Sequence, residues 1–538
     1  TALARTAPDP SGGRTGDPAA PVRSGDQLLI DASLWAMNRH GLLDFDFARP
    51  DQPVRQHRVL RDLIVAELSG ADRADREEEL RAAIGDTVLV TDQDRPAPAP
   101  QTIVRRGRQI DALRLWADRR PEVRQALLAH LSDLIVSQEE QHLQDARRLA
   151  ELAEPYWEPD SLEGLRLRSM LSQTLRHLQV YGPSARMARS VLQSYRTRLG
   201  LGHPRALLAA DGYAANLRTF GRFGDALDEG LHAARAMTRL LGPRHWTTEQ
   251  LRRNLAWRYA VLGNYPEGLR ILRLLYDHRR AVGGDDDPVV EGMVPKLAEM
   301  HRLLGQNIES YQLLKKARVL GGAQPRISRV PLVVQAENGL AVSERRLGGH
   351  ERAQERDLRT LDMAAAMLGE RSIAALRCRF SLAADHHLLG DHDGAVAETE
   401  RCLEGLEATL GPEHPYADLC RVRLGVHLRG AGRLPQARDV GRAAQENLRR
   451  RLGDHHPWVL AAAASVANAL VELDELDEAV RLEEFARLGY DRTGFGRHPD
   501  RALVADNLAM TRARRLGAPP TGEEPRRRAD IDLELPDL

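Results

Sequence analysis

One position in this sequence repeatedly carries a side chain that could bind an acidic ligand. Five of six evenly spaced glycines are preceded, three residues earlier, by an arginine or a histidine: Arg218, Arg302, Arg345, His387 and Arg429. An arginine binds a carboxylate through two parallel hydrogen bonds, so a row of arginines on one surface would bind an acidic peptide. Alternatively, each arginine pairs with an acid on a neighbouring repeat, where it contributes little. The sequence leaves both interpretations open.

No other cluster predicts catalysis or metal binding. Asp385, His386 and His387 come close to Asp391, His392 and Asp393, but their spacing matches no zinc pattern. Because the group straddles a turn, it indicates a solvated loop. The sequence contains no Gly-x-x-x-x-Gly-Lys-Ser/Thr motif that would cradle a phosphate. No Ser–His–Asp or Cys–His arrangement is recognisable either. We therefore expect no catalytic residue, metal or cofactor in this chain, which is not predicted to be an enzyme.

The glycines that follow the arginine row belong to a repeat. Their spacing is 42 residues, once 43, at Gly221, Gly263, Gly305, Gly348, Gly390 and Gly432. Small residues recur five positions later, at Ala226, Gly268, Ser310, Ala353, Ala395, Ala437 and Ala479. A period of this length indicates a solenoid of stacked units. Within a unit, apolar residues at helical spacing predict two helices, and the glycine between them can take the left-handed conformation that ends a helix.

Two motifs of the repeat resemble a known family. The Gly-x-aromatic-x-x-small core, as at Gly221, Phe223 and Ala226, resembles the hallmark of tetratricopeptide repeats (TPR). The Leu-Gly-x-x-His opening, as at Leu241 to His245, is similar to the kinesin-light-chain form of that repeat. The resemblance implies an all-α, TPR-like helical-hairpin solenoid, with the arginine position facing a concave groove. In such an array we expect each unit to contact only its neighbours.

Composition limits the other classes of function. Lys+Arg and Asp+Glu are both 77, so no global charge favours nucleic acid. No apolar run reaches the 18 residues of a membrane span, and no signal peptide opens the chain. The three cysteines are too few and scattered for a disulfide framework, which predicts buried free thiols at Cys378, Cys402 and Cys420. We expect a cytoplasmic location.

The region before the array has a different pattern. Residues 42–47 alternate like a strand and residues 54–57 could return as a second one, which predicts a small winged-helix domain over 24–100. These segments resemble the winged-helix subdomain of NB-ARC ATPases of the STAND signalling class. In that family a Met-His-Asp histidine contacts the ADP β-phosphate, and the resemblance places His57 there, although Gln56 and Arg58 depart from the motif. The alternative is that His57 merely ends a strand.

A DNA-reading winged helix is the competing interpretation of this region. Arg55, Arg58 and Arg61 are offset by Asp62 and Glu67, a modest phosphate footprint that predicts no direct binding of nucleic acid. If the NB-ARC resemblance holds, the ATPase domain would precede Thr1 in a parent protein, and ATP or ADP would bind there.

The predicted organisation has five parts. They are a disordered linker (1–23), the winged-helix-like domain and joint (24–100), an irregular helical N-terminal cap (101–160), the TPR array (161–517) and a disordered acidic tail (518–538). The last nine residues alternate acidic and aliphatic side chains, so the tail could occupy an arginine-lined groove. If it does, we expect it to reach only the C-terminal units, near Arg429 and His387. The alternative is a tail that touches nothing.

Taken together, the chain resembles the C-terminal part of an actinobacterial NB-ARC (STAND)–TPR protein, similar to the TPR proteins of FxSxx-COOH peptide systems. The resemblance implies a sensor or scaffold arm that binds a protein or peptide in its groove, and the arginine row indicates an acidic one. The alternative is the regulatory TPR region of an NB-ARC-containing transcriptional activator.

Overall fold

A computed structural model describes residues 36–37, 39, 43–44, 55–56, 70–87, 100–137, 139–285, 287–317, 329–493, 498–517 and 528–536. The chain divides into two compact units: residues 1–136 with 145–170, and residues 137–144 with 171–538. Almost all described residues outside turns are helical.

The two short strands lie where the sequence predicts a hairpin. They are β1 (Leu43–Asp44) and β2 (Arg55–Gln56), paired antiparallel with Leu43 opposite Gln56. His57 follows β2 directly but lies outside the described residues. The winged-helix domain therefore stays a prediction.

The helices that follow are α3 (Gly70–Thr87), α4 (Pro100–Ala112), α5 (Pro121–Ser137), α6 (Glu140–Ala153) and α7 (Leu162–His177), with short 3₁₀ turns at Leu115–Ala117 and Glu154–Tyr156. The first compact unit buries an aliphatic face of α5, including Leu127, Leu128 and Leu131. Its Trp157 indole N–H donates to the Trp116 carbonyl at 3.0 Å.

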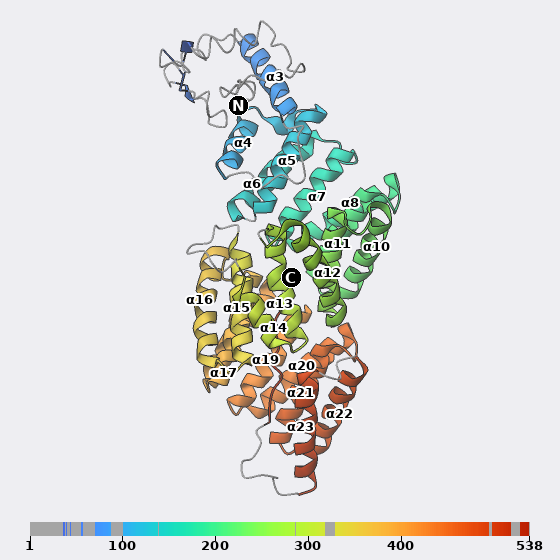
Figure 1. Ribbon diagram of the computed structural model, residues 1–538, viewed down its shortest axis with the longest axis vertical. Helices are drawn as coiled ribbons and strands as arrows, with labels where there is room; N and C mark the ends of the chain where they lie inside the picture. The colour runs from blue at the N-terminus through green and yellow to red at the C-terminus, as the bar shows by residue number, and fades with distance from the viewer. Residues whose placement is uncertain are drawn as a thin grey trace. The chain divides into compact units, whose positions relative to one another are not determined.

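The second unit is a series of helical hairpins (Figure 1). Its helices are α8 (Tyr181–Leu199), α9 (Pro204–Arg218), α10 (Phe223–Leu241), α11 (Trp246–Val261), α12 (Tyr265–Gly283), α13 (Pro288–Leu303), α14 (Asn307–Lys315), α15 (Val330–Arg346), α16 (His350–Leu368), α17 (Ile373–Leu388), α18 (His392–Leu410), α19 (Pro415–Gly430), α20 (Leu434–Leu452), α21 (Pro457–Glu472), α22 (Leu476–Arg492) and α23 (Pro499–Arg515). From α13 onward the odd-numbered helices, which open each hairpin, also pack on one another. They form the inner row of the array.

The repeat pattern of the sequence has a direct structural cause. Each glycine of the 42-residue series has a positive φ, between 69° and 88°, and ends the first helix of its hairpin. In the preceding and following units Gln179 and Asp474 take the same conformation with φ of 61° and 63°. The small residue five positions later is buried in every unit, where the two helices cross. The solenoid prediction is confirmed.

Units far apart in the sequence also touch, at what we call the inter-turn seam. His414, His456 and His498 each place Nε2 3.0–3.2 Å from a backbone carbonyl 195 or 196 residues earlier, at Arg218, Val261 and Leu303. The array thus completes a superhelical turn and packs on itself between four and five units later. The expectation that each unit contacts only its neighbours is wrong for this array, because the superhelix is tight enough to bring successive turns together.

Glycine and aromatic packing complete the seam. A Cβ at Gly221, Gly263 or Gly305 would lie 2.3–2.4 Å from the ring of the proline that follows each seam histidine. Phe223 of α10 packs against Tyr416 and Trp458, with ring centroids 6.1 and 6.4 Å apart. The seam therefore needs glycine for close approach as well as for its backbone conformation.

Candidate tail groove

The C-terminal segment 528–536 lies along the inner row of the array. Its residues contact side chains of α13, α15, α17, α19, α21 and α23, which together we call the tail groove. Leu533, Glu534 and Leu535 are buried there. The prediction of a disordered acidic tail over 518–538 is therefore wrong for these residues, because the groove supplies partners for their charges and cover for their aliphatic side chains.

The central acid of the tail is held by three arginines. Arg345 of α15 binds Asp532 through two of its nitrogens, at 3.1 and 3.3 Å. Arg346 reaches the same carboxylate at 3.1 Å, and Arg423 of α19 also lies at 3.1 Å. Burial alone would raise the pKa of Asp532, but the three guanidinium groups hold it well below its ordinary value. The three guanidinium groups therefore favour the ionised form of this carboxylate.

Arg345 bridges the tail to the array. Its Nη1 lies 3.1 Å from Asp385 and donates to the Ser381 hydroxyl at 2.9 Å. Burial disfavours its charge, but Asp532, then Asp385 and Asp357, raise the pKa of Arg345. The prediction that Asp385 belongs to a solvated loop is wrong: this carboxylate is buried on the inner face of α17. One array acid and one tail acid therefore share the same guanidinium group.

The next acid along the tail is bound two residues later. Glu534 accepts from Arg302 Nε at 3.0 Å and lies 3.0 Å from its Nη2. It also pairs with Arg346 at 2.7 Å, so Arg346 joins Asp532 and Glu534. Burial acts in the opposite direction, but Arg302 and Arg346 lower the pKa of Glu534. The side chains of Arg302 and Glu534 are 2% and 4% exposed, which makes this a buried ion pair.

At the other end of the groove, amides bind the tail backbone. Asn507 of α23 donates to the Ala529 carbonyl at 2.9 Å and accepts from the Ala529 N–H at 3.3 Å. Asn468 of α21 donates to the same carbonyl at 3.0 Å and to Asp530 at 2.8 Å. Arg429 completes the binding of Asp530. The contacts at Ala529 are made to its backbone, so they do not depend on its side chain.

A charge of the opposite sign precedes these acids. Arg528 pairs with the buried Glu483 of α22 and donates to Thr511 at 2.7 Å. Arg528, Asp530, Asp532 and Glu534 thus occupy alternate positions, as side chains on one face of an extended strand do.

The aliphatic side of the strand is covered as well. Ile531, Leu533 and Leu535 are at most 9% exposed. The void left beside Leu533 and Leu535 is about 10 Å³, too small for more than a single water. The tail fits the groove closely on both faces.

The structure brings together three of the five residues of the predicted arginine row. Arg302, Arg345 and Arg429 each bind a different acid of the tail. His387 is not hydrogen-bonded to the tail but stacks on His427, with centroids 5.0 Å apart. Burial, opposed by nearby Asp530, lowers the pKa of His387 to about 4. Arg218 lies at the seam, where its carbonyl faces His414.

The tail also extends further than expected, from the last units back to Arg302 of α13.

Several groove residues were missed from the sequence: Arg346, Arg377, Arg423, Asn468 and Asn507. The arginine row samples one position of the first helix, whereas Arg346 stands next to that position and the other four residues stand three to ten residues before it. Asn507 stands two 42-residue periods after Arg423, and Asn468 interrupts the alanine-rich α21. Polar residues in register on an apolar helix are the signal that could have found them.

Before α13 the inner row pairs a buried arginine with an acid of the array. Arg258 of α11, 1% exposed, lies 2.7 Å from Asp211 of α9 and donates to the Asp211 carbonyl at 3.1 Å. Here the counter-charge belongs to the array itself. Arg258 stands two residues before Ala260, so it is not a member of the predicted arginine row.

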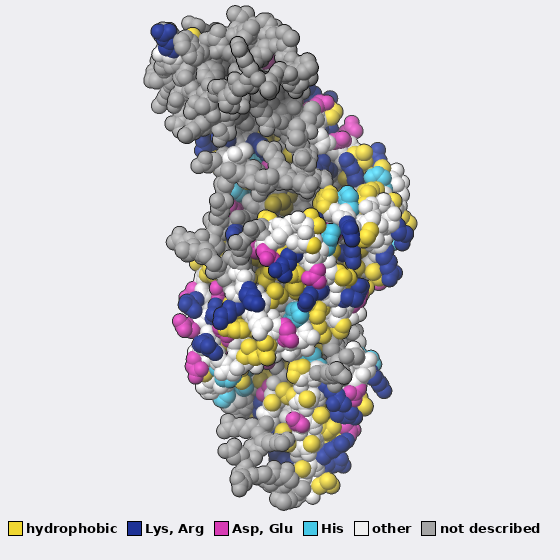
Figure 2. All heavy atoms as spheres, viewed as in Figure 1, with side chains coloured by type: hydrophobic (Ala, Val, Ile, Leu, Met, Phe, Trp, Pro, Cys, Tyr) yellow, Lys and Arg dark blue, Asp and Glu magenta, His cyan; other side chains and the backbone are white. Residues whose placement is uncertain are grey.

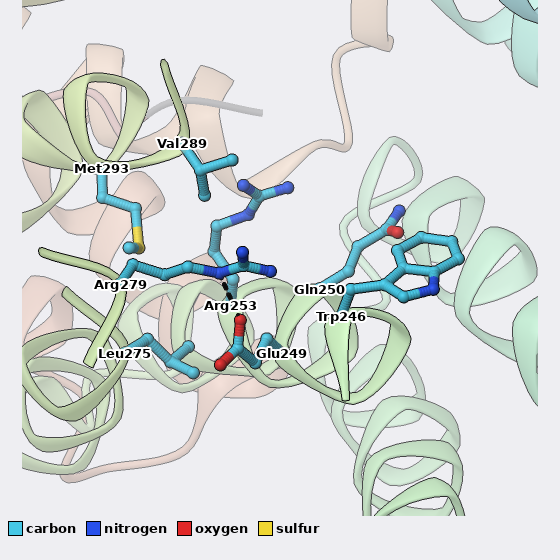
Figure 3. A pocket seen from close by; sticks show the side chains of 8 residues that line it. All are labelled: Trp246, Glu249, Gln250, Arg253, Leu275, Arg279, Val289 and Met293. Carbon is cyan, nitrogen blue, oxygen red and sulfur yellow. Dashed lines mark hydrogen bonds and ion pairs between the residues drawn. The ribbon is translucent and has the colours of Figure 1, made fainter. Parts of the chain in front are cut away.

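A small pocket between α11, α12 and α13 is the other candidate cavity (Figure 3). Glu249 and Arg279 pair across its floor, and Trp246, Arg253 and Met293 line it. Its volume is about 120 Å³, below the roughly 300–1,000 Å³ of small-molecule sites. The tail groove is the better-developed site.

Other site types find no support within the described residues. No group of three or more His, Cys, Asp or Glu side chains there could hold a metal ion. No described helix is both long and apolar enough to cross a membrane. Cys378, Cys402 and Cys420 are buried free thiols, as expected. On the face shown in Figure 2, basic and acidic side chains are interspersed, in contrast to the arginines gathered in the groove.

Residues 376–416, from α17 into α19, match the family model of the tetratricopeptide repeat. This match covers 41 of the 538 residues, about one 42-residue unit of the array. None of the curated proteins matches the sequence.

Solved structures similar to this chain include TPR-like repeats of a putative kinesin light chain from Podosopora anserina, with 17% identity over 39% of this chain and 97% of that one, at a TM-score of 0.32. The apo quorum sensor NprR from B. thuringiensis has 14% identity over 67% and 97%, at 0.43. A STAND protein with a tetratricopeptide repeat sensor from Pyrococcus horikoshii has 13% identity over 82% of this chain and 66% of that one, at 0.36.

Proposed function

We propose that this chain is the peptide- or protein-binding arm of a STAND-type signalling protein, and that its ligand is an extended acidic segment bound in the tail groove. The observation that carries the proposal is the binding of Asp530, Asp532 and Glu534 by three different arginines of the predicted row. Charge-assisted pairs at alternate positions, combined with contacts to backbone carbonyls, are how grooves recognise extended peptides.

The regulatory TPR region of an NB-ARC-containing transcriptional activator would use the groove in the same way. The two possibilities differ in what is joined to the array, and therefore in the readout of binding. Nucleotide sensing through His57 and an ATP- or ADP-binding parent domain stay predictions of the resemblance.

A displayed library of random peptides tests the proposal. The bait is the full chain with Asp532→Ala and Glu534→Ala, which removes two tail carboxylates from the groove. We expect selection of peptides with acids at alternate positions, and at least a tenfold loss of their affinity when Arg302→Gln is added. Selection of no peptide, or of peptides indifferent to Arg302→Gln, would contradict the proposal.

A further inference from the structure

The tail is bound as a ligand would be. It lies beyond Gly517, which follows the end of the last helix, α23, and ten residues separate Gly517 from Arg528. It adds no helix to the stack. Side chains of the array bind its backbone carbonyls at Ala529, Leu533 and Leu535, through Asn507, Arg423 and Arg377 respectively.

These backbone contacts define a direction and a register. The Ala529 end of the strand lies against α21 and α23, whereas Glu534 lies against α13. The strand therefore runs from the last units toward earlier ones. A segment from another molecule would need the same direction to place its acids opposite the same arginines.

The charged side chains of the groove indicate its net charge in the absence of the tail. Six arginines contact the tail, from Arg302, Arg345, Arg346 and Arg377 to Arg423 and Arg429. Four array acids pair with some of them: Glu299, Asp357, Asp385 and Glu472. The tail contributes three more carboxylates. An empty groove would therefore carry an excess of buried positive charge, which attracts an acidic segment and is costly to leave unpaired.

We infer that residues 528–536 are a tethered mimic of the partner, and that the partner must displace them to bind. The inference rests on the proposed function of the groove. It assigns the partner a motif: a base followed by acids at the second, fourth and sixth positions after it, with aliphatic residues between the acids. Arg528, paired with Glu483, distinguishes this motif from a merely acidic peptide.

Tethering makes the tail a strong competitor. A linker of this length gives the tail an effective concentration on the order of millimolar in its own groove. A partner present at micromolar concentration must therefore bind the empty groove far more tightly than the tail does. The tethered tail therefore sets a threshold of partner concentration, below which the tail remains in the groove.

Fluorescence anisotropy with a labelled peptide of residues 527–538 tests the inference. The peptide is titrated against the wild-type chain and against the Asp532→Ala/Glu534→Ala chain. The control is Asp393→Ala/Glu413→Ala, which removes two exposed acids that pair with Arg433 and Arg451. We expect the peptide to bind the tail variant at least tenfold more tightly than it binds the wild type or the control. A peptide with the same residues in scrambled order should not bind.

Equal affinity for the wild type and the tail variant would overturn the inference, as would no binding to a tail variant with native helical circular dichroism. If that variant does not fold, hydrogen–deuterium exchange on the wild-type chain decides. Unlabelled peptide at ten millimolar should accelerate exchange in residues 528–536, and unchanged exchange would show that the tail is a permanent part of the array.

The two proposals fail in different ways. Peptides selected from the library that bind the wild-type chain and the tail variant equally would leave the proposed function standing and refute the tethered mimic. Binding of the tail peptide without selection of any foreign sequence would refute the proposed function and leave a displaceable tail.

Discussion

The inter-turn seam and the tail groove both join parts of the chain that are far apart in sequence, but with different chemistry. The seam uses neutral groups of the repeats themselves: histidines that meet carbonyls, and prolines that pack on glycines. The groove uses charges, and part of its counter-charge comes from a segment outside the repeats. One contact is built into the array, whereas the other depends on a tethered strand.

This difference suggests which contact can be exchanged. A seam histidine cannot leave without moving the helix that it caps, because its Nδ1 accepts from the backbone N–H two residues on, as His456 does from Trp458 at 3.2 Å. The tail is held mainly by side chains of the array, so we expect it to leave without moving a helix. We therefore expect seam defects to be permanent and groove defects to be repaired by an added strand.

The largest effect is expected in the groove. Asp532→Ala removes the carboxylate shared by Arg345, Arg346 and Arg423. Asp532 is itself 23% exposed, but Arg345 and Arg423 are 1% and 6% exposed, and removing one partner of a buried charge costs about 3–5 kcal/mol. Urea unfolding should show this loss, and wild-type tail peptide added in trans should restore most of it. Asp393→Ala, an exposed acid paired with Arg433, should change nothing measurable. If stability is lost and the added peptide does not restore it, the tail groove does not differ from the inter-turn seam in being exchangeable.

Mild acid should weaken the seam before the groove. Burial lowers the pKa of both His414 and His456 to about 4, below about 6.5 in the unfolded chain. Their contribution is complete above the unfolded value and is lost as the pH falls toward the folded one, by about 2 kcal/mol each at pH 5. The pKa values of Asp532 and Glu534 are lowered, so the tail keeps its charges at pH 5.

Hydrogen–deuterium exchange at pH 7 and 5, corrected for intrinsic rates, separates the two regions. Protection should fall around residues 218–221 and 414–416 and persist at 528–536. Loss of protection in the tail at pH 5, with protection retained at the seam, would contradict the prediction that acid weakens the seam first.

The seam glycines should tolerate substitution less well than their equivalents elsewhere. Gly263→Ala and Gly390→Ala both place a side chain at positive φ, which costs about 1–2 kcal/mol. At Gly263 the new Cβ would also lie 2.4 Å from Pro457, whereas Gly390 faces open space. Overpacking adds about 1–3 kcal/mol, so the seam variant should have the lower melting temperature. Equal melting temperatures for the two variants would mean that the seam moves apart at little cost to accommodate the new Cβ.

The smallest effect separates capping from seam contact. His245→Ala and His456→Ala both remove an N-cap acceptor, at a cost of about 1 kcal/mol. His456 also faces the Val261 carbonyl at 3.2 Å, and losing that hydrogen bond adds about 1 kcal/mol. The difference between the two urea midpoints measures the seam contact directly. No difference would assign both histidines to capping alone.

The sequence alone was sufficient to predict the hairpin array. Helix ends, buried small residues and the positions of Arg302, Arg345 and Arg429 depend on spacing within one unit, which a 42-residue period displays directly. The side chains beside them, Arg346, Arg423 and Asn507, were missed because the face of a helix that meets an added strand depends on how that strand lies.

Tertiary structure alone decided the seam and the register of the tail. Whether His456 meets Val261, 195 residues away, depends on a superhelical angle that accumulates over several units, and small packing differences at each interface set it. The same angle determines that arginines from α13, α15 and α19 converge on two tail acids two residues apart. Local sequence patterns specify each unit, but only the sum of their rotations places distant units in contact.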